Sequence, residues 1–296
     1  SAAVFAALNA VAAGQARVAL VIGVEKMTHL STADVTRGLA GASYQPEETG
    51  VSFPQVFARY AQAYRAKHGD PVDAMARIAV KNHANALQNP LAQMHKALGY
   101  EFCATPSDRN PVIADPLKVS DCSLISDGAA ALVIAAPDVD APQAVAFRGR
   151  AQVNDLLPLS RKDLTEIAGA RRAVGKALEE AGVTIADIGA AEVHDCFTIA
   201  ELLMYEAMGL AEPGQGGRLI ADGTVAHGGA LPVNLSGGLK AKGHPVGATG
   251  VSMHVLAARQ VTGTAGGMQA PGCALSLVVN MGGSGVANYA SVLEAA

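Results

Sequence analysis

The sequence predicts an α/β fold in which layers of helices and sheets are closely packed. Half of the 296 residues are hydrophobic but only 4% are aromatic, so the apolar content comes from small aliphatic side chains, which favour such packing. Apolar runs typical of buried strands alternate with helical patterns. A helix followed by an apolar run occurs once near each end of the chain, within residues 1–24 and 250–280, and this echo suggests a duplicated unit.

Composition excludes several classes of protein. The profile rules out disordered, collagenous and disulfide-scaffold chains, and a net charge of −4 without a basic stripe gives no sign of a nucleic-acid partner. Cys103, Cys122, Cys196 and Cys273 lie far apart and form no CxxC pair, so we expect neither a metal site nor a disulfide framework. A reducing cytoplasm fits this cysteine usage, and no segment resembles a secretory signal or a membrane span.

The first elements are a helix and a strand. Residues 1–13 form an apolar helical pattern with almost no polar face, and the chain lacks an initiator Met. A helix that is hydrophobic all round is normally buried by other structure, so we expect the chain to be a fragment or a processed product. Residues 16–24 form a continuous apolar run, which is typical of a buried parallel strand.

Residues 31–112 differ in character, because they hold more Pro, Tyr, Gln, Asn and His. This composition predicts an inserted, more polar subdomain with helices over residues 56–67, 71–86 and 91–98. After it, the Asp127-Gly128 turn precedes a predicted strand over residues 130–135.

The second half repeats the alternation of helix and strand. The elements that we predict there are a helix over 160–181 ended by Gly182, a strand over 188–193, a helix over 199–208, an irregular Gly-rich stretch over 211–246, a helix over 250–260, and strands over 273–280 and 286–292.

Two reactive side chains stand where a strand ends and a helix begins. His194 and Cys196 follow the strand over 188–193, and the carboxyl ends of strands are where α/β folds place ligands. An imidazole and a thiol two residues apart can share a site there. The alternative is a buried structural cysteine beside a capping histidine.

Two glycine-rich loops carry the other candidate site residues. His244 lies between Gly243 and Pro245, before a helix whose first N–H groups can meet a ligand. The loop is neither a Walker A motif nor a GxGxxG after a strand, so a turn without chemistry remains the alternative. Gly282 follows a buried strand, and its backbone N–H can serve an oxyanion unless the segment is a simple hairpin turn. His254 falls inside a helix, which predicts a structural role.

Three motifs together resemble those of the thiolase superfamily, most of all the sterol-carrier-protein-type thiolases and their bacterial and archaeal relatives. They are HDCF at 194–197, SGGLKAKGHPVGATG at 236–250 and NMGG at 280–283. Further segments extend the resemblance along essentially the whole chain: GVEKM at 23–27, VKNHANALQNP at 80–90 and NPVIADPLKVSDCSLISDGAAA at 110–131.

The resemblance implies a layered αβαβα fold of two duplicated halves, with two helices sandwiched between the sheets and a loop domain inserted over the coenzyme A site. It divides the chain into a remnant of the N-terminal half (1–30), the loop domain (31–112), the end of the N-terminal half (113–145) and the C-terminal half (146–296). The first helix would be one of the sandwiched pair.

The resemblance also implies an acyl-CoA C-acyltransferase, which makes or cleaves 3-ketoacyl-CoA through an acyl-cysteine intermediate. In the sterol-carrier-protein group His194 and His244 line the oxyanion hole and Cys196 is the acid/base, because Asn280 replaces the acid/base thiol of other thiolases. Gly282 keeps the matching N–H. A free thiol has a pKa of about 8.5, so we expect neighbouring imidazoles and a helix N-terminus to lower that of Cys196.

One departure from the family pattern concerns the nucleophilic cysteine, which in thiolases stands just before the central helix that the first helix of this chain resembles. None of the four cysteines matches that position, so we expect no acyl transfer by residues 1–296 alone. Two alternatives remain. One is a thiolase-like aldolase, although such relatives tend to carry Tyr where this chain has His194. The other is a non-catalytic acyl-CoA-binding or scaffold subunit.

The ligands and partners are also implied by the resemblance. Coenzyme A thioesters are substrates rather than permanently bound cofactors, and Ser236 and Gly237 are the residues expected to contact the pantetheine arm. Lys240 and Lys242 are expected to be solvated rather than bound to phosphate, and Ala200 and Met204 are candidates for an acyl pocket. The family forms homodimers or dimers of dimers, and some members pair with a zinc-ribbon/OB-fold accessory protein.

Overall fold

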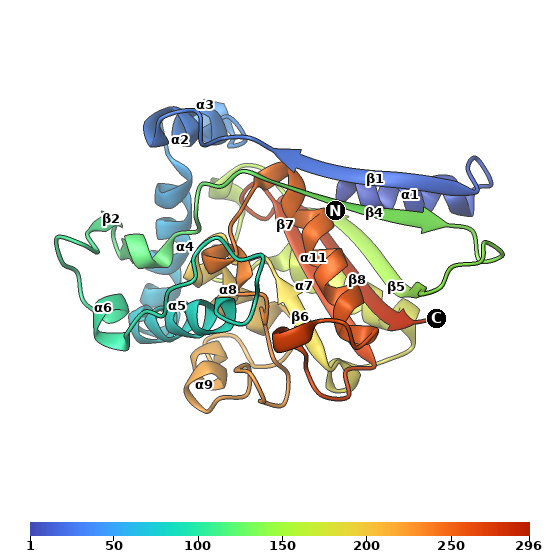
Figure 1. The fold of residues 1–296 in the computed structure, drawn as a ribbon. Helices are drawn as coiled ribbons and strands as arrows, with labels where there is room; N and C mark the ends of the chain where they lie inside the picture. Colours follow the sequence, from blue (N-terminus) through green and yellow to red (C-terminus); the bar gives the residue numbers. More distant parts are fainter.

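The computed structural model describes residues 1–296 and contains two principal β-sheets with helices between and beside them (Figure 1). The smaller sheet pairs β1 (Val18–Glu25) with β4 (Gly128–Ala135), antiparallel. The larger sheet has the order β5-β8-β7-β6, and only β6 and β7 run parallel. Its strands are β5 (Val145–Asn154), β6 (Ala190–Val193), β7 (Leu275–Gly282) and β8 (Ala287–Ala295).

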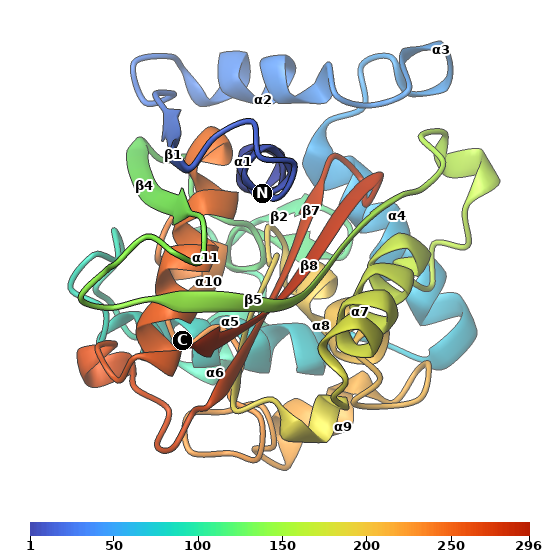
Figure 2. The same ribbon diagram turned by 90° about the vertical axis from the view of Figure 1, so that its right-hand side faces the viewer.

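Two helices lie between the sheets, as the layered fold requires. Helix α11 (Val246–Val261) packs against β1 and β4 on one side and against β6, β7 and β8 on the other. Helix α1 (Ala2–Ala12), seen end-on in Figure 2, packs on β1 and β4 and also touches α11. The Phe5 ring of α1 meets Tyr289 of β8 edge to face at 5.2 Å. The helix–strand echo of the sequence therefore corresponds to α1–β1 and α11–β7.

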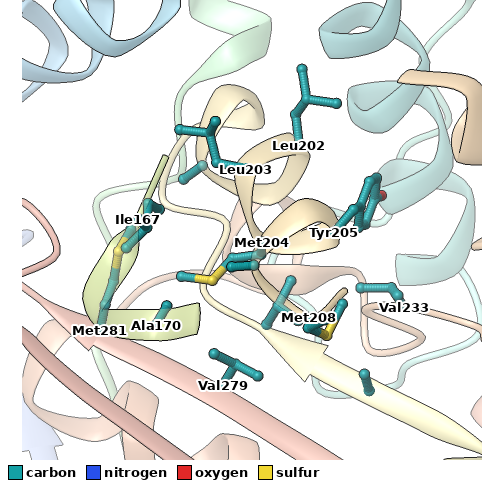
Figure 3. Close-up of a cluster of buried hydrophobic side chains, with 14 of the residues drawn as sticks. Ile167, Ala170, Leu202, Leu203, Met204, Tyr205, Met208, Val233, Val279 and Met281 are labelled. Atoms are coloured by element: carbon teal, nitrogen blue, oxygen red, sulfur yellow. The ribbon is translucent and has the colours of Figure 1, made fainter. Parts of the chain in front are cut away.

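Helices α7 (Ala168–Ala181) and α8 (Thr198–Ala207) cover the other face of the larger sheet and contact each other. Every residue of α8 is buried, which makes this helix the centre of the largest hydrophobic cluster (Figure 3). Ala200 and Met204 belong to this cluster and are fully buried. They pack in the core, so the suggestion that they shape an acyl pocket is not supported.

The segment between β1 and β4 is an insertion, because these two strands pair with each other although they are distant in sequence. In the structure the insertion runs from the end of β1 to the start of β4. The domain boundaries at residues 30 and 112 stay predictions. Its elements are α2 (Thr32–Ala40), α3 (Gln45–Glu48), α4 (Phe53–His68), α5 (Val72–Ala86), α6 (Tyr100–Ala104), β2 (Val112–Ala114) and β3 (Leu117–Lys118). Two short helices, α9 (Gly216–Ala221) and α10 (Gly238–Ala241), interrupt the irregular stretch of the second half.

The prediction of a buried parallel strand at residues 16–24 is wrong in pairing and in burial. Strand β1 is antiparallel to β4, and Val21 is buried at 3% exposure while Leu20 and Ile22 are 64% and 60% exposed. Val18 and Val24 lie on the same exposed face, which no element of residues 1–296 covers. A continuous apolar run cannot distinguish these cases, because it looks the same whether one face or both are covered.

Two predicted helices also differ. Residues 91–98 form no helix, because the backbone N–H groups of Gln93 and Met94 donate to the carbonyls of Lys242 and Ala241 at the end of α10. The helix expected from residue 160 begins at Ala168. Before it, the carboxylate of Asp163 accepts bonds from the N–H and hydroxyl of Thr165, which forms a turn instead. None of the helices has the length and hydropathy that crossing a membrane requires.

Candidate active site

The structure brings His194 and His244 together. His194 directly follows β6, and its backbone N–H donates to the Val279 carbonyl of β7 at 3.0 Å. His244 lies in the turn before α11, after Gly243, whose φ of +110° favours glycine. The two rings meet edge to face, with centroids 5.1 Å apart and planes at 87°. Elements far apart in the sequence thus place two imidazoles side by side.

Both imidazoles are held in the neutral form. Burial lowers the pKa of His244 to about 3, with a further contribution from the charge of Lys242. Burial also lowers the pKa of His194 well below its usual value, and His244 adds to the effect. At neutral pH the pair therefore carries no charge, and it acts through hydrogen bonds rather than as imidazolium.

The Nδ1 atoms of both rings have partners within the protein. Nδ1 of His194 lies 2.9 Å from Nδ2 of Asn280, and Nδ1 of His244 lies 2.7 Å from Oγ1 of Thr249. Oδ1 of Asn280 in turn accepts a bond from the Ser1 hydroxyl at 3.0 Å, which places the start of α1 beside the pair. The Nε2 atoms of His194 and His244 bond to no protein group, so they are available to a ligand.

Cys196 lies two residues after His194, just before α8, and is 6% exposed. Burial raises the pKa of its thiol well above the usual value, and the charge of Asp195 raises it further. The expectation that imidazoles and the helix N-terminus lower this pKa is therefore wrong, because desolvation outweighs them. At neutral pH Cys196 is a thiol that can give up a proton to a strong base such as an enolate.

Asp195 connects the HDCF turn to the glycine-rich loop. Its carboxylate accepts bonds from the backbone N–H groups of Leu239 at 2.6 Å and Lys240 at 3.2 Å, and from Nδ2 of Asn82 at 2.8 Å. Gly238 makes this approach possible, since a Cβ there would lie 2.1 Å from Asp195 Oδ2. The carboxylate therefore sets the path of the chain toward His244.

A buried polar network extends from Asp195 into the insertion. Glu201 of α8 accepts bonds from Nδ2 of Asn82 at 2.6 Å and of Asn234 at 2.9 Å, and its other oxygen pairs with Lys81 of α5 at 2.7 Å. Motif reasoning missed Glu201 altogether. Lys81 and Asn82 were only part of the segment 80–90 that carried the family resemblance, with no role attached to them.

The other predicted site residues are Gly282, Ser236 and Gly237. Gly282 ends β7, opposite Ala287 and two residues beyond Asn280. Ser236 is 1% exposed, and its hydroxyl donates to Glu192 at 2.6 Å. Gly237 has φ of +95° and packs against α5, where a Cβ would lie 2.6 Å from that of Ala86. Contact of Ser236 and Gly237 with a ligand stays a prediction, and both have structural partners here.

Two expectations about the glycine-rich loop are wrong. Lys240 and Lys242 are not solvated, as only 3% and 8% of their surfaces are exposed, and burial lowers the pKa of both. The N–H of Gly247, the second residue of α11, is also occupied, because it donates to the Glu25 carboxylate at 3.1 Å. His254, expected to be structural, is buried with both ring nitrogens hydrogen-bonded.

Comparison with known families agrees with this architecture. A family model described as "Thiolase, N-terminal domain" matches residues 1–101, and one described as "Thiolase C-terminal domain-like" matches residues 151–295. An acetyl-CoA acetyltransferase of Methanothermobacter thermautotrophicus is 38% identical over 94% of this chain and 73% of its own length. Sterol carrier protein 2 of Oryctolagus cuniculus is 33% identical over 97% of this chain and 55% of its own length.

Solved structures show the same fold. The Ltp2-ChsH2(DUF35) aldolase matches with a TM-score of 0.83 and 26% identity, over 99% of this chain and 76% of that one. A monomeric SCP2-thiolase-like protein type 1 of Mycobacterium smegmatis matches in fold, with a TM-score of 0.72 and 24% identity, over 99% and 60%. Two stacked sheets with helices between them define a layered α/β chain. The chain belongs to the thiolase superfamily, in its sterol-carrier-protein-2 type, and spans about half to three quarters of the length of its curated relatives.

Proposed function

We propose that this protein is an acyl-CoA C-acyltransferase, which forms or cleaves the carbon–carbon bond of a 3-ketoacyl-CoA through an acyl-cysteine intermediate. The observation that carries the proposal is the edge-to-face pair of neutral imidazoles at 5.1 Å, with a protonated thiol two residues from one of them. Coenzyme A thioesters are the substrates, and no permanently bound cofactor takes part.

The chemistry follows from these groups. In the condensing direction the minor thiolate form of Cys196, which has lost its proton to solvent, removes a proton from the α-carbon of acetyl-CoA and becomes the thiol, while the electron pair moves onto the thioester oxygen. Nε2 of His194, Nε2 of His244 and the N–H of Gly282 are the donors that we assign to that oxygen. The enolate carbon then attacks the acyl-cysteine carbonyl, and the cysteine leaves as a thiolate. In the reverse direction the Cys196 thiol returns the proton.

The acyl-carrying cysteine is assigned to none of the four in residues 1–296. Cys103 and Cys273 are buried, and the Cys122 thiol bonds to the Lys118 carbonyl at 3.4 Å. Cys196 is assigned the acid/base role. The Ser1 side chain, bonded to Asn280, marks the end of α1 that faces the histidine pair. We place the acyl group of the intermediate at this end, on a cysteine outside residues 1–296.

Intact-mass spectrometry after incubation with acetyl-CoA tests this assignment. We expect no acetyl adduct on residues 1–296, and an adduct on a protein extended by the reading frame upstream of Ser1, together with thiolysis of acetoacetyl-CoA. An acetyl adduct on residues 1–296 would contradict the assignment, as would an upstream sequence without a cysteine within a few residues of Ser1.

An aldolase is the second candidate, because one solved structure similar to this chain is the Ltp2-ChsH2(DUF35) aldolase. Retro-aldol cleavage by the extended protein, without any acyl-enzyme, would favour this function over acyl transfer. His194 argues for acyl transfer, since it supplies the imidazole donor where thiolase-like aldolases tend to carry Tyr.

Partners are part of the proposal. The name of that aldolase couples Ltp2 with ChsH2(DUF35), and another relative, 32% identical, is a benzoylsuccinyl-CoA thiolase subunit of Thauera aromatica. We propose a cytoplasmic homodimer or dimer of dimers that can pair with a zinc-ribbon/OB-fold accessory protein. Light scattering of the purified protein tests the oligomer. Co-purification with such a partner, with coenzyme A bound through Ser236 and Gly237 but no turnover, would instead indicate a scaffold subunit.

A further inference from the structure

Two asparagines of the insertion bond to backbone carbonyls of the glycine-rich segment 233–244. Nδ2 of Asn85 on α5 donates to the Asn234 carbonyl at 3.0 Å, and Nδ2 of Asn89, shortly after α5, donates to the Ser236 carbonyl at 2.8 Å. A carbonyl only accepts, so the NH2 end of each amide faces it. Asn85 is 6% exposed and Asn89 is fully buried, so water hardly competes for these bonds.

The same pairing of chain segments continues on both sides of the two amides. Nζ of Lys81 on α5 donates to the Val233 carbonyl at 2.6 Å. Farther along, the backbone N–H groups of Gln93 and Met94 donate to the two carbonyls at the end of α10, at 3.1 Å each. The chain from Lys81 to Met94 therefore runs beside the chain from Val233 to Lys242 and bonds to it at intervals.

The end of the insertion holds the last residue of the segment. The Ser126 hydroxyl accepts the backbone N–H of His244 at 3.1 Å and donates to the Leu124 carbonyl at 3.1 Å. Ser126 is fully buried, and Gly243 allows the close approach, since a Cβ there would lie 2.9 Å from the Ser126 Oγ. His244 is thus fixed from the insertion, while Asp195 fixes the centre of the segment.

The segment depends on outside contacts because its own backbone is irregular. Gly237, Gly238 and Gly243 have φ of +95°, +59° and +110°, and glycine loses more conformational freedom on folding than any other residue. The carbonyls of Val233 and Ser236 accept no backbone N–H group. A buried carbonyl without a donor is costly, so the side chains of the insertion satisfy groups that the segment cannot satisfy itself.

We propose that Asn85, Asn89 and Ser126 are positioning residues, through which the insertion holds the glycine-rich segment in place for the substrate. Asn85 and Asn89 hold the end at Ser236, where we expect coenzyme A to bind, and Ser126 holds the end at His244. The hold itself follows from contacts within residues 1–296. The part that each end takes in the reaction rests on the proposed function. The insertion is then a fixed part of the site, joined to its backbone.

Hydrogen–deuterium exchange measures the hold without any need for activity. The amides of residues 233–244 should exchange as slowly as those of α5. Asn89→Ala should speed their exchange roughly 10-fold, about the effect of one lost hydrogen bond, and leave β7 and β8 unchanged. Asn85→Ala is the milder second variant, because the carbonyl that Asn85 contacts keeps the bond from the Gly237 N–H at 3.0 Å.

Gln88→Ala is the matched control for these two variants. Gln88 lies between the two asparagines, and its exposed side chain makes no hydrogen bond within the protein. Its substitution should leave the exchange of residues 233–244 as it is. If Asn85→Ala and Asn89→Ala also leave this exchange unchanged in the folded protein, the inference fails.

Substitution of Ser126 tests the other end of the segment. Ser126→Ala removes the acceptor of the His244 N–H, so the NMR ring signals of His244 should move in the folded protein. Those of His254, which lies on α11 and is held by Gly250 and Ser291, should not. Unchanged signals of His244 would overturn the role of Ser126.

Kinetics tell a positioning role from a merely structural one. In the exchange of acetyl-CoA α-protons, Asn89→Ala should raise the half-saturating concentration roughly 10-fold with little change in the maximal rate. A smaller folded fraction would lower the maximal rate instead, and that result, or two unchanged constants, would overturn the positioning role. Slow amide exchange that depends on Asn89, without any reaction of acetyl-CoA, would refute the proposed function and leave the hold by the insertion standing.

Discussion

The ammonium group of Lys81 on α5 lies 2.7 Å from the Glu201 carboxylate on α8, and both side chains are almost completely buried. Asn82 bonds to Glu201 and to Asp195 at once, so the ion pair is joined to the turn that carries His194 and Cys196. Phe197 of this turn also stacks on Phe57 of α4 at 4.7 Å. A buried polar network and an aromatic stack therefore hold the insertion against the candidate site.

Lys81→Met should destabilise the protein strongly, because it leaves the Glu201 charge buried without its partner. We expect a loss of about 3–5 kcal/mol in the free energy of unfolding, measured with urea. Arg37→Met is the control, since its ion pair with Asp34 is exposed and should contribute only about 0.2–1 kcal/mol. The double variant Lys81→Met/Glu201→Gln should recover part of the loss. Equal effects of the two single substitutions would contradict the role of the buried pair.

Gly238→Ala should disturb the loop that Asp195 holds. Gly238 has φ of +59°, and a Cβ would lie 2.1 Å from Asp195 Oδ2. Gly263 has φ of +69° with open space around it, so Gly263→Ala reports backbone strain alone, about 1–2 kcal/mol. Gly238→Ala should cost about 1–3 kcal/mol more, because the new methyl group overpacks the carboxylate. Thermal or urea unfolding measures the difference, which should be absent if Asp195 does not contact this loop.

His254 should make the stability depend on pH. Burial lowers its pKa from 6.5 to about 4, so between these values the unfolded chain binds a proton that the folded chain does not. Its contribution is fully present above pH 6.5 and falls as the pH falls, by about 2 kcal/mol between pH 7 and pH 5. His254→Gln should remove this part of the dependence. Urea unfolding at both pH values measures it, and an unchanged slope in the variant would argue against a neutral buried imidazole.

The raised pKa of Cys196 sets the direction of another pH effect. Below that pKa the thiolate fraction rises about tenfold with each pH unit, so the removal of a substrate proton should accelerate with pH through the neutral and mildly alkaline range. Cleavage, which uses the thiol as an acid, should not show this rise. Rates of both directions across this range provide the test. A plateau of the condensing step below the ordinary thiol pKa would indicate a lowered pKa instead.

Sequence patterns located most of the elements because helical period and apolar runs are local signals. The position of α5 was predicted to within a residue, whereas β5 was missed and the pairing of β1 was wrong. Pairing depends on which strand lies alongside, and residues 18–25 find theirs only after the whole insertion. Likewise, the motifs indicated His194 and His244. The hydrogen bonds of Asn280 and Thr249 to these imidazoles, and the ion pair of Glu201 with Lys81, were not visible. They join segments distant in sequence or depend on the geometry within a turn.

The exchange of acetyl-CoA α-protons for deuterium is the reaction that depends most directly on the candidate site. It requires a base and an oxyanion hole but no acyl-carrying cysteine, so residues 1–296 can be tested as they stand. Proton NMR in D2O should show exchange that is abolished by Cys196→Ala and reduced roughly 10²–10³-fold by His194→Ala or His244→Ala. Exchange no faster than in buffer, or equally fast in Cys196→Ala, would contradict the assignment of this site to acyl-CoA chemistry.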